Sequence, residues 1–362
     1  MNKDLQRTEH NAPTPGNQKT IGIDLGDRWS RYCILGGDGQ IVEEDRIPTS
    51  TGALERAFKK MPATRVVVEA GTHSPWVSRL LEKLGHEVVV ANARKVRLIY
   101  ESDSKNDRLD ARMLARLGRV DVNLLAPIRH RGAETQADLA VIRGRDCLVA
   151  ARTQLINAVR GMVKSVGGRL PKSTTAAFAG KVSSLIPSEL KVALEPLLSS
   201  IAALTEQIAK ADEQIAQLAE AKYPETKLLR QVKGVGPLIA LTYVLTVGDP
   251  HRFAKSRTVG SYLGLRPRQR ESGSSAPQLG ISKAGNSHLR WLLIQAAHYI
   301  LGPLAPDSGL RRWGLGLAGK GGKSGKRKAV VAVARKLAVL LHRLWVTAEV
   351  YEPLYGIESE AA

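Results

Sequence analysis

Cysteine is almost absent from this chain of 362 residues, in which Cys33 and Cys147 are the only two. Two cysteines are too few for a disulfide framework or a zinc cluster, which predicts a reducing, cytoplasmic setting. Apolar runs long enough to span a bilayer are also missing, and residues 1–19 lack the apolar core of a signal peptide. We therefore expect no membrane partner. Because residues 1–19 are polar and contain two Pro, we expect a disordered tail there.

Acidic residues are scarce relative to basic ones. The 54 Lys and Arg outnumber the 34 Asp and Glu, which gives a net charge of +20 and a sequence pI near 10.1. A soluble protein this basic is usually neutralised by a polyanion, most often a nucleic acid. An anionic membrane surface fits less well, because no segment combines a basic face with a bulky aromatic one.

The stretch Thr20–Leu35 indicates a buried strand that turns directly into a second strand. Asp24 places a carboxylate on the first strand, where burial is costly unless a partner such as a metal ion compensates the charge. Gly22 and Gly26 allow close backbone approach and a tight turn. An equally good interpretation puts Asp24 at the strand end, where it caps the turn.

Strands and helices alternate after this hairpin, and Glu69 directly follows one of the strands. The expected order is strand, helix, strand, helix and strand, at Gln40–Ile47, Thr51–Lys60, Arg65–Val68, Ser74–Gly85 and His86–Ala91. Three consecutive strands followed by strands alternating with helices predict a mixed sheet covered by helices.

A helix is expected at Ser104–Gly118, and it carries two more acids. Asp107 and Asp110 stand three residues apart and therefore share a helix face. A purely structural interpretation makes Asp107 the N-cap and Asp110 a partner of the helix dipole.

Long helices are expected from about Glu134 onward, with a polar interruption at Pro171–Pro187. One helix repeats apolar residues in steps of three and four, at Ile201, Leu204, Ile208, Ala211, Ile215 and Leu218. This short heptad seam suits either an intramolecular helical hairpin or a dimer contact.

Two glycine-containing basic segments follow. Val232–Pro237 predicts a loop before a helix N-terminus, which suits a backbone phosphate or a plain helix-helix turn. Gly319–Lys328 puts five basic residues among the nine from Lys320 to Lys328 and precedes an apolar helix expected at Ala329–Trp345. We interpret this flexible strip as a clamp on a nucleic-acid backbone. A nucleotide phosphate loop is rejected because no strand precedes it.

The four acids together suggest one catalytic site. Asp24, Glu69, Asp107 and Asp110 all lie in the expected α/β unit. Two divalent metals roughly 4 Å apart, held by several carboxylates, stabilise the entering and leaving oxygens of a phosphodiester displacement. Mg²⁺ suits oxygen-only ligands best.

These residues carry a family resemblance. Ile21–Asp24, Glu69–Ala70 and Asn106–Arg112 resemble the DEDD transposases of bacterial insertion sequences, whose N-terminal domain is similar to the Holliday-junction resolvase RuvC. Further motifs resemble that family's second domain, at Gly234–Gly236, Arg252–Ala254, Leu263–Leu265, Pro267–Arg268, Glu271–Gly273, Ile281–Gly285 and Leu289–Arg290.

The resemblance implies three folded parts between two tails. An α/β domain with a RuvC-like, ribonuclease-H-like mixed sheet is expected at 20–130, and a helical coiled-coil arm at 131–224. A mainly helical C-terminal transposase domain is expected at 225–350, followed by a tail at 351–362.

The resemblance also implies the chemistry. Asp24, Glu69, Asp107 and Asp110 would bind Mg²⁺, and Ser272 would be the nucleophile that leaves a covalent phosphoserine on DNA. The partners would be donor and target double-stranded DNA, a structured non-coding bridge RNA, and further copies of the chain in a dimer or tetramer. The expected nucleic-acid contacts are Lys233, Gly234, Gly236, Arg268, Lys283, Arg290, Lys320, Lys323, Lys326, Arg327 and Lys328. Because aromatic residues make up only 4%, the RNA would be recognised through backbone and shape.

Two other functions remain open at this point. A RuvC-like junction nuclease would keep the metal site but use water as the nucleophile, with Ser272 structural. A non-catalytic scaffold that packages nucleic acid would explain the charge but leave the four acids without a role. A sugar-kinase or actin-like ATPase, suggested by Ile21–Gly26, is set aside because no second repeated half is visible.

Overall fold

The computed structural model describes residues 19–99, 106–270, 272, 277, 279–319 and 321–354. The chain divides into two compact units, Met1–Ala133 and Glu134–Ala362. The second unit contains both the expected helical arm and the expected C-terminal domain. Most of the two expected tails lies outside the described residues.

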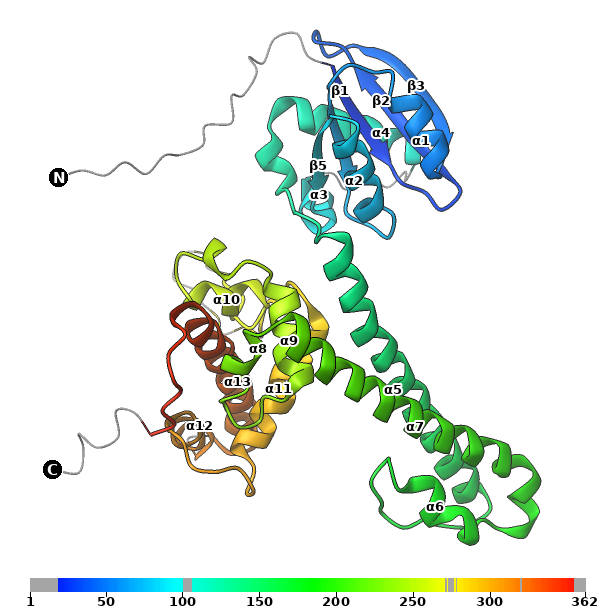
Figure 1. The fold of residues 1–362 in the computed structure, drawn as a ribbon, viewed down its shortest axis with the longest axis vertical. Coiled ribbons are helices and arrows are strands. Elements are labelled where there is room, and N and C mark those ends of the chain that lie inside the picture. The colour runs from blue at the N-terminus through cyan, green and yellow to red at the C-terminus, as the bar shows by residue number, and fades with distance from the viewer. Residues whose placement is uncertain are drawn as a thin grey trace, which may run out of the picture. The chain divides into compact units, whose positions relative to one another are not determined.

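The first unit is built on a five-stranded mixed sheet (Figure 1). Its strands are β1 (Thr20–Asp24), β2 (Trp29–Leu35), β3 (Ile41–Pro48), β4 (Arg65–Glu69) and β5 (Glu87–Ala91). The spatial order is β3-β2-β1-β4-β5, antiparallel across the first three strands and parallel from β1 to β5. The predicted mixed sheet is confirmed, with β1 at its centre.

Helices cover both faces of this sheet. They are α1 (Thr51–Phe58), α2 (Ser74–Lys83), α3 (Ala93–Ile99) and α4 (Asp107–Val120), followed by the 3-10 turn η1 (Val122–Leu125). Ile21 and Ile23 pack in one buried cluster with residues of α1 and α2. Val67, Cys33 and Leu35 pack in clusters with residues of α4. Alternate residues of the central strands therefore face different helices.

The second unit begins with an antiparallel helical pair, α5 (Ala133–Ser165) and α7 (Lys191–Lys222). Arg145 Nε donates to Asp212 at 2.8 Å, and Lys222 Nζ donates to Asp138 near the start of α5 at 2.8 Å. The heptad seam supplies buried residues of α7, including Ile208. Of the two interpretations of the seam, the structure shows the intramolecular hairpin.

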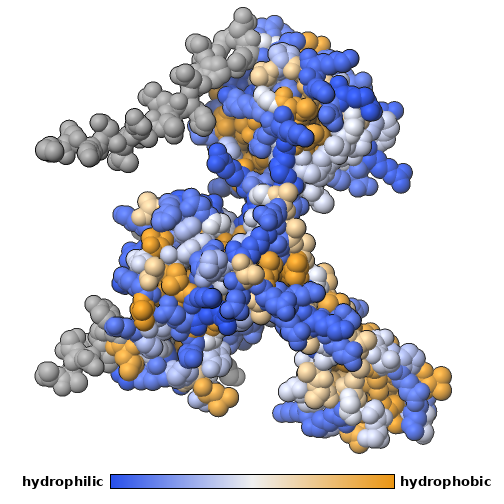
Figure 2. Space-filling model, in the orientation of Figure 1, coloured by the Kyte–Doolittle hydropathy of each residue, from blue (hydrophilic) through white to orange (hydrophobic). Residues whose placement is uncertain are grey.

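The interruption between these helices is not simply polar, contrary to the prediction. It contains α6 (Phe178–Val182) and the turns η2 (Ser183–Leu185) and η3 (Ser188–Leu190). Phe178 and Val182 are buried against Val159 of α5 and Leu194 of α7, because their few apolar side chains close the end of the hairpin. Apolar Leu185 and Val192 remain exposed there. Figure 2 shows hydrophobic surface at this end of the hairpin.

The remaining helices share one core. They are α8 (Thr226–Leu229), α9 (Pro237–Val247), η4 (Pro250–Arg252), α10 (Arg257–Tyr262), α11 (Ser287–Leu301), α12 (Gly309–Gly319) and α13 (Gly322–Thr347). Tyr243 is fully buried at the centre, and its hydroxyl donates to Ala338 O at 2.7 Å. No helix in the described part of the chain is long and apolar enough to cross a membrane.

One sequence expectation about this core is wrong. The helix expected to begin at Ala329 begins at Gly322, so most of the basic strip is helical rather than a flexible loop. Contacts with this core also continue past residue 350, where Tyr351 N donates to Gln231 Oε1 at 2.8 Å and Gly309 N donates to Pro353 O at 2.7 Å. The start of this helix and the contacts past residue 350 both depend on residues far apart in the sequence, so the local sequence does not indicate them.

Candidate active site

Two of the predicted acids end neighbouring strands of the sheet. Asp24 is the last residue of β1 and Glu69 the last of β4, and Ile23 is in register with Val68 between them. Because these strands are parallel, Asp24 and Glu69 leave the sheet at the same edge. Both residues are half-buried. Asp24 thus lies at the strand end, not in the strand interior.

Both of these acids belong to the sheet face that α4 covers. Residues two apart on a strand share a face, so Asp24 goes with Gly22 and Glu69 with Val67. A Cβ built on Gly22 would lie well under 3.0 Å from the carbonyl oxygen of Ala111 in α4. Val67 is buried in one cluster with apolar residues of α4.

Helix α4 runs antiparallel to β1 on this face. Near its end, a Cβ built on Gly118 would lie 3.6 Å from Thr20 at the start of β1. One to two turns earlier, Ala111 lies against Gly22 in the middle of the strand. The first turn of α4 therefore points toward the end of β1, where Asp24 stands.

Asp107 and Asp110 occupy that first turn, Asp107 exposed and Asp110 half-buried. The helix is capped by Asn106, whose side chain accepts from Arg108 N at 3.0 Å, so the interpretation of Asp107 as the N-cap is wrong. Among the residues that the structure describes, no group of three or more His, Cys, Asp or Glu could hold a metal ion as placed. The first turn of α4 thus lies toward the edge at which β1 and β4 end, and the acids described there form no closed ligand set.

Glu44 of β3 fixes the orientation of α4, a role that the sequence did not reveal. Its carboxylate accepts from Arg108 Nε at 2.8 Å and from Arg112 Nη2 at 2.7 Å. These bonds, foremost the one from Arg112, lower the pKa of Glu44 to about 2, and its side chain is only 8% exposed. Burial raises the pKa of the neighbouring Cys33 thiol to about 11, so it is a neutral packing group. Glu44 therefore holds the helix that presents Asp107 and Asp110.

Replacing Glu44 with glutamine is expected to lower the stability of the first unit at pH 7 by about 2 kcal/mol, because charged hydrogen bonds are lost. The folded-state pKa lies below the ordinary value of 4.5, so the wild-type advantage is full above that value. It should fade as the pH falls toward 2. Urea unfolding of both proteins at pH 7 and pH 3 measures this. A difference between wild type and Glu44→Gln that grows at pH 3 would contradict the assignment.

The turn after Glu69 carries further groups that the sequence did not single out. Ser74 Oγ accepts from Gly71 N at 2.9 Å and lies 2.8 Å from His130 Nε2. Trp76 Nε1 donates to His73 Nδ1 at 3.1 Å, and because indole is only a donor, Nδ1 carries no proton. Hydrogen bonds from Gly71 to Ser74 and from Trp76 to His73 therefore stabilise the conformation of this turn.

Ser272 lies in the second unit and is exposed. Its flanking residues 271 and 273–276 are outside the described part of the chain. On either side of this stretch, backbone hydrogen bonds run from Arg268 N to Gly280 O at 3.0 Å and from Ser282 N to Arg266 O at 2.9 Å. Ser272 therefore lies in the sequence between two backbone segments that are paired with each other.

The predicted nucleic-acid contacts fall into different environments. Lys233, Arg268 and Lys283 are exposed, as is Gly236, which is the N-cap of α9. Gly234 has a φ of +95°, and a Cβ there would lie 2.8 Å from the Tyr299 ring.

Arg290 does not fit its predicted role as a surface contact. It is 8% exposed and donates to Leu263 O at 2.9 Å and to Ala284 O at 2.7 Å. Because the guanidinium is turned inward onto carbonyl groups, it braces the loop between α10 and α11.

The basic strip presents Lys326, Arg327 and Lys328, all exposed, in the early turns of α13. Lys320 and the side chain of Lys323 lie outside what the structure describes. Cations near a helix N-terminus oppose the helix dipole, and a bound anion would relieve that cost. The strip therefore remains suited to a phosphate backbone, on a helical rather than a flexible support.

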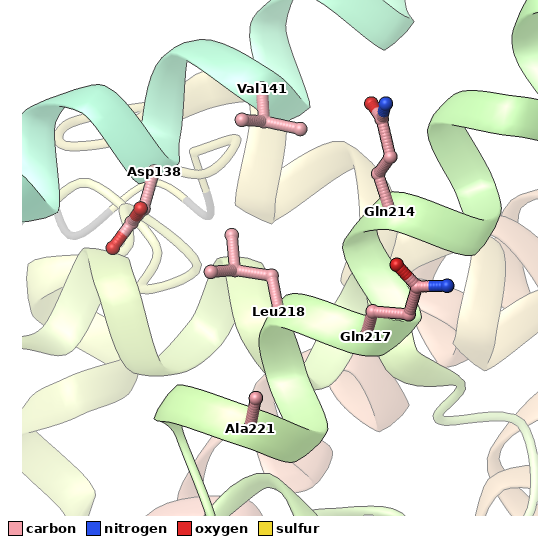
Figure 3. A pocket seen from close by; sticks show the side chains of 6 residues that line it. All are labelled: Asp138, Val141, Gln214, Gln217, Leu218 and Ala221. Carbon is pink, nitrogen blue, oxygen red and sulfur yellow. The ribbon is translucent and has the colours of Figure 1, made fainter.

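A hollow of about 370 Å³ lies between α5 and α7 (Figure 3). It is lined by Asp138 and Val141 from α5 and by Gln214, Gln217, Leu218 and Ala221 from α7. Asp138 is occupied by Lys222 and by the Tyr223 hydroxyl, which donates to it at 2.5 Å. The hollow is therefore part of the hairpin packing. The Asp138 carboxylate already accepts hydrogen bonds from Lys222 and Tyr223 and is not available to a ligand.

Comparison with known proteins identifies related sequences along most of the chain. The family model described as "Transposase IS116/IS110/IS902 family" matches residues 226–307, and a DEDD transposase model of IS110 elements matches residues 21–167. A "Probable family 20 transposase" of Pseudomonas aeruginosa is 30% identical, covering 93% of this chain and 99% of the relative.

Two further relatives agree with this assignment. The "Transposase for insertion sequence element IS1111A" of Coxiella burnetii is 29% identical, covering 92% of this chain and 91% of the relative. The "Transposase for insertion sequence element IS1328" of Yersinia enterocolitica is 28% identical, covering 82% and 88%. With a mixed-sheet unit in the region of the DEDD match, the chain belongs to the IS116/IS110/IS902 family of insertion-sequence transposases.

Proposed function

We propose that this transposase cuts and exchanges DNA strands through a serine nucleophile, Ser272, assisted by an acidic metal site. The observation that supports the proposal is that β1 and β4, which end in Asp24 and Glu69, are parallel neighbours, and that the first turn of α4 lies toward the same end of β1. A packaging scaffold has no need for such an arrangement.

The donor set fits a divalent cation, and its oxygen-only chemistry favours Mg²⁺. Asp24 and Glu69 would hold it from the sheet and Asp107 and Asp110 from α4. When bound, the cation stabilises negative charge on the entering and leaving oxygens of a phosphodiester. Since no closed ligand set exists among the described residues, the side chains must move together on binding.

Ser272 is suited to attack because it is exposed and lies between two backbone segments that hydrogen-bond to each other. In the proposed step, the Oγ–P bond forms as a P–O bond to a deoxyribose oxygen breaks. The hydroxyl of Ser272 gives up its proton, and the leaving oxygen takes one up, so the phosphodiester is conserved as a phosphoserine linkage. Rejoining a different strand reverses the same bonds.

The partners proposed for this reaction are two DNA duplexes, a structured non-coding RNA that selects them, and further copies of the chain. The net charge of +20 and the exposed Lys326, Arg327 and Lys328 support binding to a nucleic-acid backbone. Exchange between two duplexes requires more than one set of cleavage residues, which supports a dimer or tetramer.

Replacing Ser272 with alanine is expected to abolish covalent attachment of DNA. Purified protein, Mg²⁺, RNA transcribed from the element's non-coding end and labelled junction DNA are incubated and resolved on a denaturing gel. Wild type should give a DNA band shifted by covalent protein, and Ser272→Ala should give none. The matched control is Ser282→Ala, an exposed serine outside the loop, which should retain the band. Cleavage that survives in Ser272→Ala without an adduct would identify a water-dependent, RuvC-like nuclease instead.

A further inference from the structure

An exposed arginine at the end of η4 lies over two aromatic rings. The Arg252 Cζ is 4.5 Å from the ring centroid of Phe253 and 4.5 Å from that of Tyr262. The two rings contact each other edge to face at 5.3 Å, and the Tyr262 hydroxyl donates to Thr246 O at 3.3 Å. Contact with two rings restricts the position of the guanidinium. The N–H groups at the edge of the guanidinium remain able to donate hydrogen bonds.

A buried histidine anchors this platform to α13. His342 is 1% exposed and contacts the Phe253 ring at 5.6 Å. Its Nε2 lies 2.9 Å from Pro250 O and its Nδ1 lies 2.9 Å from Ser256 Oγ. A carbonyl only accepts, so Nε2–H donates to Pro250 O, and Nδ1 forms the second hydrogen bond with the serine hydroxyl. One side chain therefore fixes both ends of the segment that carries Arg252.

Within the described part of the chain, the two aromatic rings are the groups that contact the Arg252 charge, and no ion pair neutralises it. No carboxylate there forms an ion pair with it, and the acid closest in sequence, Asp249, accepts from His251 N at 2.8 Å. Lys255 and Arg257, which follow, are also exposed and basic. Holding an unpaired guanidinium rigid among like charges costs free energy, which a bound anion would return.

We propose that Arg252, held by Phe253 and Tyr262, is a binding site for a nucleic-acid phosphodiester. A planar fork of N–H donors matches two oxygens of one phosphate, and the stacked rings remove the entropy cost of ordering the side chain. The proposal deepens the proposed function, on which it rests, by naming a phosphate contact in the second unit. The phosphate can belong to DNA or to RNA, and the test separates these sources.

The test measures fluorescence anisotropy of full-length protein with labelled junction duplex in one arm and with RNA from the element's non-coding end in the other. Both arms omit Mg²⁺, so no strand cleavage is required. Arg252→Ala should lower the slope of log affinity against log salt by about 1 and weaken binding at low salt by about tenfold in the arm that supplies the phosphate. Arg252→Lys keeps the charge and the slope but should still weaken binding several-fold, because ammonium lacks the planar fork.

Arg343→Ala is the matched control, because Arg343 is exposed but already paired with Glu349 at 2.9 Å. It should leave slope and affinity unchanged. An effect in the DNA arm alone identifies a DNA phosphate, and one in the RNA arm alone an RNA phosphate. The proposal would be overturned if Arg252→Ala bound both DNA and RNA with wild-type affinity. It would also be overturned if Arg252→Lys bound with wild-type affinity. If instead the serine mechanism fails, the Ser272→Ala adduct assay reports it while the anisotropy result stands.

Discussion

Asp24→Asn is expected to reduce DNA strand cleavage by at least about a thousandfold, or about 4 kcal/mol of barrier. Asparagine keeps the size of the side chain and removes the charge that would hold a divalent cation at the end of β1. Cleavage of junction DNA in Mg²⁺ measures the effect on rate. Calorimetric titration with Mn²⁺ provides a readout independent of activity, and the variant should bind this ion much more weakly than wild type.

Asp27→Asn is the matched control for this experiment. Asp27 lies in the turn three residues later, its side chain is 93% exposed, and the substitution changes net charge by the same amount. This variant should cleave DNA and bind Mn²⁺ as wild type does. If Asp24→Asn retained cleavage near the level of Asp27→Asn, the metal-site proposal would fail and the scaffold function would gain support.

Gly22→Ala is expected to have the largest effect on stability, about 3 kcal/mol or more. The added methyl would overlap the backbone of α4 at Ala111 and lies 3.1 Å from the Cα of Ala115. Backbone cannot rotate away as a long side chain can, so α4 must shift and carry Asp107 and Asp110 away from the sheet edge. Urea unfolding and hydrogen exchange of peptides from β1 and α4 measure the loss of stability and its location. Cleavage should fall as well.

Gly52→Ala is the appropriate control, since it adds the same methyl group in the same unit. Gly52 lies in the first turn of α1, where a Cβ would make only an ordinary contact of 3.4 Å with Arg56. Alanine favours helix over glycine, so stability should be unchanged or slightly higher. Equal stability of Gly22→Ala and wild type would show that α4 does not pack closely on β1.

Much of the first unit was predictable because short stretches of sequence indicate where its strands and helices begin and end. The Val-rich β4 strand, the Ser50 cap of α1 and the positive φ of +91° at Gly85 after α2 are all short-range signals, and the structure contains each of them. The close approach at Gly22 was also predicted, although its partner was not. The helix boundary at Asp107 was missed by few residues, but its cap was assigned to the wrong side chain.

Predictions failed where a residue's role depends on distant partners. Arg290 was expected at the surface as a nucleic-acid contact, yet its guanidinium donates to two carbonyl groups in the interior. The basic strip contains glycines that suggest a loop, yet packing of α13 against the core extends the helix through them. Glu44 lies on a charged edge strand with no sequence signal, and only the approach of Arg108 and Arg112 gives it a role.

The sequence by itself determined the order of strands and helices in the first unit and the basic character of the chain. Those properties follow from local periodicity, composition and motif spacing, which act within a few residues along the chain. Tertiary structure alone decided that α4 runs antiparallel to β1, that Glu44 holds it there, and that Arg252 is fixed on two rings. The physical reason is that packing and ion pairing join residues tens of positions apart, and which of many possible partners meet is settled only when the chain is compact.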